Sequence, residues 1–339
     1  MLSPRIVMVI IIVMVTSVRL PVHSTVSLSK ILNRQLKNAA VLALEKGPIS
    51  GYVDVMVLNK IRLFCIDLDK PVSIYADRLP GNVFFSVDLS LGSFADHIRA
   101  QGVSLSRKAL FGFNSGLKDL DLLLPSSAKM CTIAVPCDLL DGLFLSRNFP
   151  EARQFLAQFN VLANNSIVGA DGLISLLRQC WNPCCSLSKA MLEERLLSFL
   201  VDCLIDQEDR KVAPPLRRQD RHAAALNVLS LIHSVPSKYF EVQDLANLLH
   251  HSRTSLFSAC KEKFGMSPVQ VVRSVRLRQV HHALLDTEFC AKNGLQSVSD
   301  VSQYFGFASR SQFTKYYKIE LMETPGRTLM RRRHQEENF

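Results

Sequence analysis

Hydrophobic positions change their spacing along the chain, and each change predicts a different secondary structure. Residues 28–46 have the spacing of a helix, which Gly47-Pro48 would end. Between Gly51 and Leu91, short runs of β-branched and aromatic residues alternate with turn residues, which predicts an antiparallel sheet or a small barrel. Further strands are expected near Ala109–Asn114, Asp119–Leu124 and Met130–Val135.

After Pro136 the pattern becomes helical. Three amphipathic segments follow, at Glu151–Leu162, Gly172–Cys180 and Leu187–Ile205. The charged segment 206–219, with Pro214-Pro215, has little apolar content and is the best linker in the chain. The order predicts an α+β protein, with a β-rich domain and trailing helices at 28–205 and an all-helical domain at 220–332.

Residues 1–27 are an apolar N-terminal extension of uncertain status. The run from Ile6 to Val15 resembles a signal-peptide core and is short for a membrane span, which needs about 20 apolar residues. The favoured interpretation is a true start farther downstream, near Met14. A buried strand and a membrane anchor are the alternatives.

The helical domain contains an internal repeat. Val242, Leu245, Ala246 and Leu249 are spaced as in one helix face, and Val298, Val301, Ser302 and Phe305 repeat that spacing 56 positions later. One extra residue in the second turn makes the offset 57, so that Ser252–Leu256 matches Ser309–Phe313. The pattern of each unit predicts a short helix, a tight turn and a second helix with a serine cap. The repeat predicts two helix-turn-helix units, at 241–264 and 297–321.

The outward face of each second helix is polar, with residues suited to the major groove of double-stranded DNA. Arginine can pair with guanine and glutamine with adenine, and lysines suit phosphates. The phosphate candidates are Lys261, Lys263, Lys315 and Lys318. The candidate DNA-binding residues are Ser252, Arg253, Thr254, Ser255, Ser258, Lys261, Ser309, Arg310, Ser311, Gln312, Thr314 and Lys315.

Pro268–Leu285 reads as one long helix between the units, with Pro268 in its first turn. Its apolar residues Val271, Val272, Val275 and Leu284 are expected to pack on both units. The three arginines of this helix, Arg273, Arg276 and Arg278, either reach the DNA backbone or are solvated.

Charge supports a polyanion partner for this part of the chain. The protein has a net charge of +10, and the residues from Arg210 onward hold 20 basic and 11 acidic side chains. The excess of positive charge therefore lies almost wholly in the C-terminal part, where nucleic acid would bind.

The C-terminal 110 residues resemble the AraC/XylS family of bacterial transcription regulators. The second unit carries the family's pattern at Gly306-Phe307, Ser309, Ser311 and Phe313. The sequence departs from the family where His250-His251 replaces a glycine and an apolar residue, and where Met322 replaces a glycine. The N-terminal part is weakly similar to the ethanolamine-operon regulator type.

The resemblance implies a cytoplasmic transcription regulator, an activator that contacts RNA polymerase and is not an enzyme. Its N-terminal domain would sense a small-molecule effector or mediate homodimerisation, and no cofactor or metal is expected. Nine scattered cysteines suit a reducing compartment. Because some family members carry a cysteine alkyl acceptor, a cysteine-based redox or alkyl sensor or enzyme, centred on Cys180, Cys184 and Cys185, is the alternative.

Overall fold

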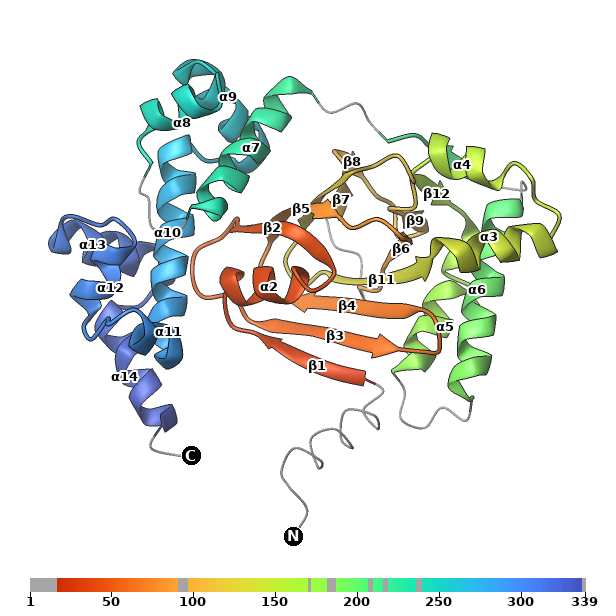
Figure 1. Cartoon of the computed structure of the whole chain (residues 1–339), viewed down its shortest axis with the longest axis horizontal. Coiled ribbons are helices and arrows are strands. Elements are labelled where there is room, and N and C mark those ends of the chain that lie inside the picture. The colour runs from red at the N-terminus through yellow and green to blue at the C-terminus, as the bar shows by residue number, and fades with distance from the viewer. Residues whose placement is uncertain are drawn as a thin grey trace, which may run out of the picture.

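The computed structural model describes residues 17–90, 97–169, 172–181, 187–206, 210–215, 219–235 and 240–336. The apolar run Ile6–Val15 and the cysteines Cys184 and Cys185 lie outside these ranges. Figure 1 shows a β-rich N-terminal part, a group of helices at its far end, and the C-terminal helices against its other side. No helix among the described residues is long and apolar enough to cross a membrane.

Two antiparallel sheets form the N-terminal part. The larger has eight strands in the order β1-β3-β4-β11-β6-β9-β12-β13, and the smaller has five in the order β2-β5-β10-β7-β8. The strands of the larger sheet are β1 (Ser17–Val22), β3 (Gly51–Val57), β4 (Arg62–Leu68), β6 (Asn82–Asp88), β9 (Ala109–Phe111), β11 (Lys129–Pro136), β12 (Val161–Ala163) and β13 (Lys211–Ala213). Those of the smaller are β2 (Leu36–Ala43), β5 (Val72–Arg78), β7 (Arg99–Ala100), β8 (Val103–Ser104) and β10 (Asp119–Leu124).

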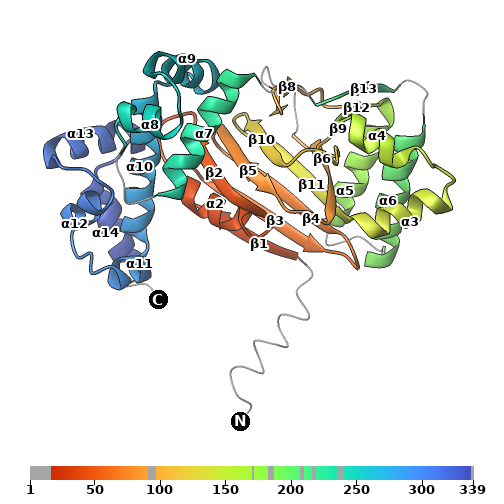
Figure 2. The ribbon, with the colours of Figure 1, turned by 45° about the horizontal axis from the view of Figure 1, so that its top comes forward.

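Side chains alternate between two cores along the larger sheet, as the period of two requires. Met130 of β11 points into the core between the sheets, whereas its neighbour Cys131 faces the trailing helices. These helices are α3 (Cys137–Ser146), α4 (Ala152–Gln158), the short 3-10 turn Asn165–Ile167, α5 (Leu173–Cys180) and α6 (Lys189–Ile205). Figure 2 shows them together at the end of the sheets opposite the C-terminal helices.

The α+β architecture is as predicted, but several boundaries differ. The predicted helix at 28–46 is wrong beyond its first part: α2 spans Thr25–Leu32, and the next residues form β2. A bulge between Lys37 and Ala40, with Asn38 at φ 53°, lets β2 pair with β5. Likewise, the end of the predicted helix Glu151–Leu162 is the start of β12, which pairs with β9 on one side and β13 on the other.

Strands are found beyond both predicted ends of the N-terminal domain. Residues 17–27, assigned to an uncertain extension, contain β1, which pairs with β3, and the start of α2. The predicted linker 206–219 contains β13, whose pairing with β12 makes it part of the larger sheet. Its short run Lys211–Ala213 has no strong period-two signal, because the strand is only three residues long.

The C-terminal helices follow the predicted repeat. They are α7 (Asp220–Ser234), α8 (Val242–Leu248), α9 (Arg253–Phe264), α10 (Pro268–Leu285), α11 (Thr287–Lys292), α12 (Val298–Tyr304), α13 (Arg310–Leu321) and α14 (Pro325–Glu336). The N-terminal half of α10 packs with the first unit through Val271, Val272 and Val275. Its C-terminal half packs with the second unit through Leu277, Val280 and Leu284. One rigid helix therefore holds both units, as the sequence predicted.

Strand β2 joins the two parts of the molecule. Val41 and Ala43 point into the core between the sheets, whereas Ala40 and Leu42 lie in the core that α7 and α9 share with the first unit. Figure 1 shows α7 and α10 beside β2. The helical domain is therefore docked on the smaller sheet through apolar contacts.

Candidate nucleic-acid interface

Each recognition helix begins at a serine whose side chain caps it. The Ser252 hydroxyl accepts a hydrogen bond from the Ser255 backbone N–H at 3.1 Å, and the Ser309 hydroxyl accepts one from the Gln312 N–H at 3.4 Å. These bonds satisfy backbone donors that a helix leaves unpaired at its start. The caps hold α9 and α13 in corresponding places in the two units.

The apolar side of each recognition helix is buried as the repeat predicts. Leu256, Ala259 and Cys260 of α9 are fully enclosed, and Phe313 and Tyr317 of α13 are enclosed in the second unit. Tyr316, expected beside Tyr317, is only half-buried, and the Arg273 guanidinium lies 4.2 Å from its ring centroid. The buried residues fix which side of α9 and α13 faces outward.

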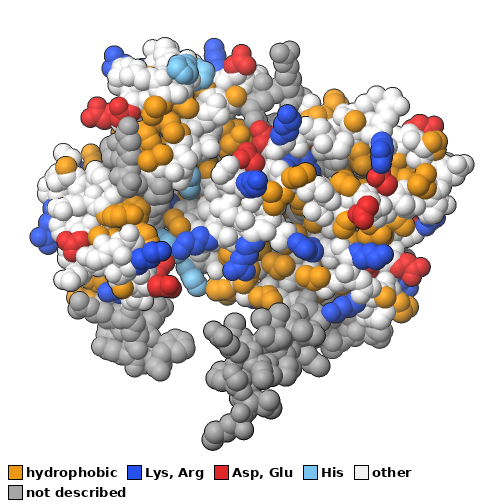
Figure 3. Space-filling view, viewed as in Figure 1, with side chains coloured by type: hydrophobic (Ala, Val, Ile, Leu, Met, Phe, Trp, Pro, Cys, Tyr) orange, Lys and Arg blue, Asp and Glu red, His pale blue; other side chains and the backbone are white. Residues whose placement is uncertain are grey.

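The structure places the predicted DNA-binding residues on these outward faces. Among the twelve, Ser255 is half-buried and the others are exposed: Ser252, Arg253, Thr254, Ser258, Lys261, Ser309, Arg310, Ser311, Gln312, Thr314 and Lys315. Lys318, predicted as a phosphate contact, is exposed as well. Figure 3 shows basic and hydrophobic side chains on the surface over α8 and α9. The sequence missed the exposed Phe257 on the same face of α9.

Lys263 is not on this surface, which corrects its prediction as a phosphate contact. Its ammonium lies 2.8 and 2.7 Å from the two carboxylate oxygens of Asp121 on β10, and little of either side chain is exposed. An ammonium held in this way is not available to DNA. The partner lies 142 positions away in the sequence, so no local pattern could have revealed the pair.

Arg276 and Arg278 are buried, which also corrects the prediction that they reach DNA or solvent. Arg276 donates to the Val235 carbonyl and to Gln279. Arg278 donates to the carbonyls of Glu45 and Gly47 and forms an ion pair with Glu320. Burial lowers the pKa of Arg278, and the charge and hydrogen bond of Glu320 raise it. Arg278 therefore ties the loop after β2 to helix α13.

Both departures from the family pattern fall where the backbone is left-handed. His250 has φ 55° in the first turn, where the second unit has Gly306 at φ 85°. Met322 has φ 59° at the end of α13, where the first unit has Gly265 at φ 69° after α9. The turns keep the helix-turn-helix geometry without the glycine, at the cost of an unfavourable backbone conformation.

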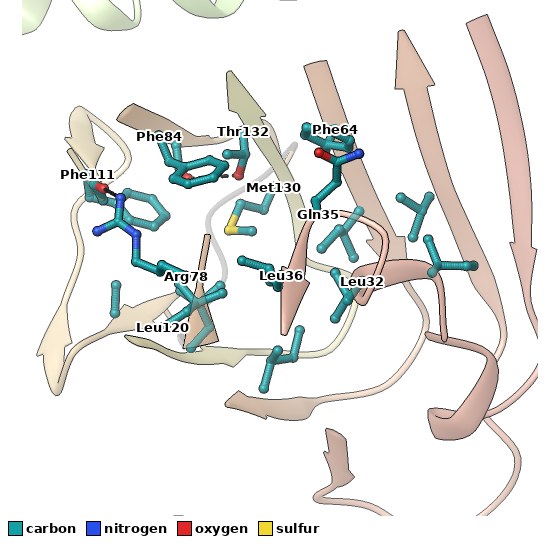
Figure 4. Close-up of a pocket in the computed structure, with 18 of the residues that line it drawn as sticks. Leu32, Gln35, Leu36, Phe64, Arg78, Phe84, Phe111, Leu120, Met130 and Thr132 are labelled. Carbon is teal, nitrogen blue, oxygen red and sulfur yellow. Dashed lines mark hydrogen bonds between the residues drawn. The ribbon is translucent and has the colours of Figure 1, made fainter. Parts of the chain in front are cut away.

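A second candidate site is an apolar pocket of about 300 Å³ between the two sheets. Leu20, Leu36, Val53, Phe64, Phe84, Phe111, Leu120, Leu122 and Met130 are among the apolar side chains that line it. Figure 4 shows the Arg78 guanidinium beside Phe111 at one end, and Gln35 beside Phe64 toward the other. The size and lining are those of a small-molecule site.

Arg78 is one of the charged side chains that line the pocket, together with Arg34 and Asp119. Its guanidinium donates to the carbonyls of Asn114, at 3.0 Å, and Gly112, at 2.8 Å. Burial lowers its pKa to about 10, against the charge of Asp119, which raises it. The side chain therefore remains a cation at neutral pH, with further donors that a ligand can use.

The described cysteines are mostly enclosed thiols. Six of the seven are buried, and Cys137 is exposed. Burial raises the pKa of Cys65 and of Cys260 to about 12, which disfavours the reactive thiolate. The Cys180 thiol donates to the Leu176 carbonyl within its own helix. Within the described ranges, no group of three His, Cys, Asp or Glu side chains could hold a metal ion.

Comparisons with known proteins agree with the geometry of the C-terminal units. Residues 245–331 match the family described as "Helix-turn-helix domain". The regulatory protein HrpB of Ralstonia nicotianae is 29% identical over 101 residues, which are 30% of this chain and 20% of HrpB. The chain thus matches only about a fifth of the length of that relative.

Solved structures give weaker likenesses. A probable AraC family transcriptional regulator from Rhodopseudomonas palustris is 24% identical, over 32% of this chain and 97% of that one, with a TM-score of 0.29. The AraC-like transcriptional activator CuxR is 14% identical, over 78% and 96%, with a TM-score of 0.38. Fatty-acid-bound ToxT from Vibrio cholerae is 16% identical, over 80% and 95%, with a TM-score of 0.29. The capped pair of units and the family match together identify residues 245–331 as a helix-turn-helix domain.

Proposed function

We propose that the protein is a sequence-specific transcription regulator, an activator, that reads double-stranded DNA with α9 and α13. The observation that carries the proposal is the pair of serine-capped helices with exposed polar faces on one rigid helix, α10. Two units fixed in this way can enter successive major grooves, about 34 Å apart on one face of the duplex. DNA binding would place the protein in the bacterial cytoplasm, with RNA polymerase as a partner.

The twelve predicted residues divide by their chemistry. Arg253, Arg310 and Gln312 can pair with base edges, and Lys261 and Lys315 suit phosphates. The capping hydroxyls of Ser252 and Ser309 already accept from their own helices, so they act mainly by placing the helix ends. Thr254, Ser255, Ser258, Ser311 and Thr314 complete the two faces.

The proposed role of the N-terminal domain is to bind an apolar small molecule in the pocket between the sheets. Two of the five donors of Arg78 are used by the carbonyls of Asn114 and Gly112, so a ligand with an acceptor head group, such as a carboxylate, suits this end. The apolar lining suits the rest of the ligand. The domain would extend from residue 17 through β13, with the DNA-binding domain starting at α7.

The smaller sheet separates this pocket from the DNA-binding domain. On β10, Leu120 and Leu122 line the pocket, and Asp121 between them holds Lys263 of α9. A ligand that fits one placement of β10 better than another would shift the populations of docked and undocked DNA-binding domains by its difference in affinity. The same shift could alter homodimerisation, which is a second proposed role of the N-terminal domain.

Selection of bound duplexes from random DNA by the full chain tests the proposal. We expect a recurrent sequence with two half-sites about one helical turn apart, and affinity that falls steeply with salt. Binding without sequence preference, or no salt-sensitive binding, would overturn it.

A further inference from the structure

Phe257 is an exposed aromatic side chain on the recognition helix of the first unit. Half of its surface is exposed, whereas Leu256, Ala259 and Cys260 on the other side of α9 are fully enclosed. Phe257 follows Arg253 and precedes Lys261 at intervals of four residues, so the three side chains lie in one row on the outward face. Its aromatic side chain therefore lies among the residues proposed to contact DNA.

The surroundings of Phe257 form a shallow groove. Val242 at the start of α8, Pro268 and Val269 at the start of α10, and Arg253 and Thr254 line it together with Phe257. Its volume is about 400 Å³. The groove gives the outward face of α9 an apolar part beside the Arg253 cation. A partner that fits must present a small apolar group close to negative charge.

The second unit has a matching residue at the same place. Thr314 follows Arg310 by four positions, as Phe257 follows Arg253, and it is exposed. The Thr314 hydroxyl donates to the Arg310 carbonyl at 2.9 Å, so its methyl group is the part left for a partner. Both units thus carry an apolar contact point between an arginine and a lysine, Lys261 in the first and Lys318 in the second.

We propose that Phe257 reads the methyl group of a thymine in the major groove, and so determines sequence specificity in the first half-site. Thymine is the base that presents a methyl group there, and phenylalanine and the threonine methyl are side chains that contact it. The neighbouring phosphates supply the negative charge for Arg253 and Lys261. The inference rests on the proposed DNA-binding function and adds the base that one position reads.

The test uses the full chain and a duplex that it selects from random DNA. Replacing single thymines by deoxyuracil removes one methyl group each and leaves the pairing edges intact. For the wild-type protein, we expect one such replacement in the half-site of the first unit to weaken binding about fourfold, the effect of one buried methyl-sized group. The Phe257→Ala variant should bind the thymine and deoxyuracil duplexes equally, and Phe257→Leu should keep part of the difference.

Two control variants test whether the loss of the thymine preference is specific to Phe257. Leu145 on α3 is 83% exposed and lies away from the recognition helices, so Leu145→Ala should leave the thymine preference unchanged. Thr314→Ser, which keeps the hydroxyl and removes the methyl group, should abolish the effect of a thymine in the other half-site only. Circular dichroism on each variant confirms that the helices are retained.

The outcomes separate the two proposals. If the chain selects no sequence, the proposed function fails. If it selects a sequence but no thymine replacement in that half-site matters, or if Phe257→Ala keeps the full difference, only the reading of a methyl group is overturned. Unchanged DNA binding with lost activation by Phe257→Ala would also overturn it, because the face would then bind a protein.

Discussion

The Lys263 ammonium of the first recognition helix is held by both carboxylate oxygens of Asp121, at 2.7 and 2.8 Å, on a strand that also lines the apolar pocket. Only 10% of the lysine side chain and 4% of the aspartate side chain are exposed. The pair therefore joins the β-rich domain to α9 in a place that excludes most water. Removing one partner would leave a charge that neither solvent nor protein compensates.

Asp121→Ala should therefore lower the free energy of unfolding by about 3 kcal/mol, because it strands the Lys263 cation. The double variant Asp121→Ala/Lys263→Met should recover most of that loss, since neither charge remains. Urea unfolding of the wild type, both single variants and the double variant measures the coupling. If the losses in the free energy of unfolding of the two single variants add up to the loss in the double variant, the interaction between Asp121 and Lys263 contributes nothing to stability.

The ion pair between Lys263 and Asp121 predicts that Lys261 and Lys263 differ in their effect on DNA binding. Lys261→Ala should reduce the slope of log affinity against log salt by about one, the effect of one lost phosphate contact. Lys263→Met should leave this slope unchanged, because its ammonium is already bound to Asp121. A reduced slope for both variants would show that Lys263 leaves Asp121 in the complex with DNA.

Base and phosphate contacts should differ in their effect on sequence preference. Arg310→Ala or Gln312→Ala should cost about 1–3 kcal/mol on the selected duplex and relax preference at one base pair, because each removes a bidentate partner. Lys315→Ala should weaken binding to all duplexes alike. Competition with single-base variants of the site measures the preference. Lys292→Ala on α11, which is exposed but off both recognition helices, is the control and should change neither quantity.

The helices of the DNA-binding domain were predictable because their signals are local. Serine caps, the spacing of apolar residues and Pro268 in the first turn of α10 all act within a few residues, and the repeat doubles each signal. The outward positions of Arg310 and Gln312 followed from the same periodicity. The sequence did not indicate that Phe257 is exposed, because a single aromatic residue on a helix usually faces a core.

Contacts between distant segments were not predictable. Residues 36–43 share helix-like spacing with α2, and only pairing with β5, helped by the bulge at Asn38, makes them a strand. Arg278 looks like a solvated cation in the sequence, yet its acceptors Glu45 and Gly47 lie more than 230 positions away. Long-range partners of this kind decide whether a charge is on the surface, and a single sequence does not contain them.

A glycine at position 322 and an alanine at position 265 should have opposite effects on stability, because both positions have a left-handed backbone at the end of a recognition helix. Met322→Gly should raise the free energy of unfolding by about 1 kcal/mol, because glycine adopts φ 59° without the steric cost that a side chain carries. Gly265→Ala should lower it by a similar amount. A Cβ at Gly265 meets no atom within 4 Å, so only backbone strain changes there. Thermal unfolding of both variants measures the difference, and effects of the same sign would contradict this account.

Stability should fall with acid because buried histidines stay neutral. His282 on α10 contacts Ser24 and Lys30 of the N-terminal part, and burial together with the Lys30 charge lowers its pKa to about 4. The ordinary pKa of 6.5 applies to the unfolded chain, which therefore binds more protons below that pH. The contribution of the neutral His282 to the free energy of unfolding is therefore present above about pH 6.5 and is lost as the pH falls toward 4.

For His282 this loss is on the order of 2 kcal/mol between pH 7 and pH 5. His281→Gln and His282→Gln should each reduce the fall, since burial also lowers the pKa of His281 to about 4. Urea unfolding at several pH values measures it. A slope in the His282→Gln variant equal to that of the wild type would show that this histidine does not titrate differently in the folded state.

Arg78 should decide which apolar molecules bind the pocket between the sheets. Because its pKa is about 10, the side chain is charged at neutral pH, and hydrogen bonds to a charged partner stabilise by about 1.5–3 kcal/mol. A series of hydrophobic carboxylic acids and the matched alcohols, added to the full chain in thermal unfolding, should therefore show tighter binding of the acids.

Arg78→Met should remove that preference and bind acid and alcohol alike, because the apolar lining is unchanged. Arg153→Met is the matched control: Arg153 is a surface arginine paired with Asp141, and its loss should leave the preference intact. The acid preference should persist as pH is raised to about 9 and decline near pH 10, as Arg78 loses its proton. Acids that stabilise the wild type and Arg78→Met equally would place the head group elsewhere, toward Arg34 and Gln35, which also line the pocket.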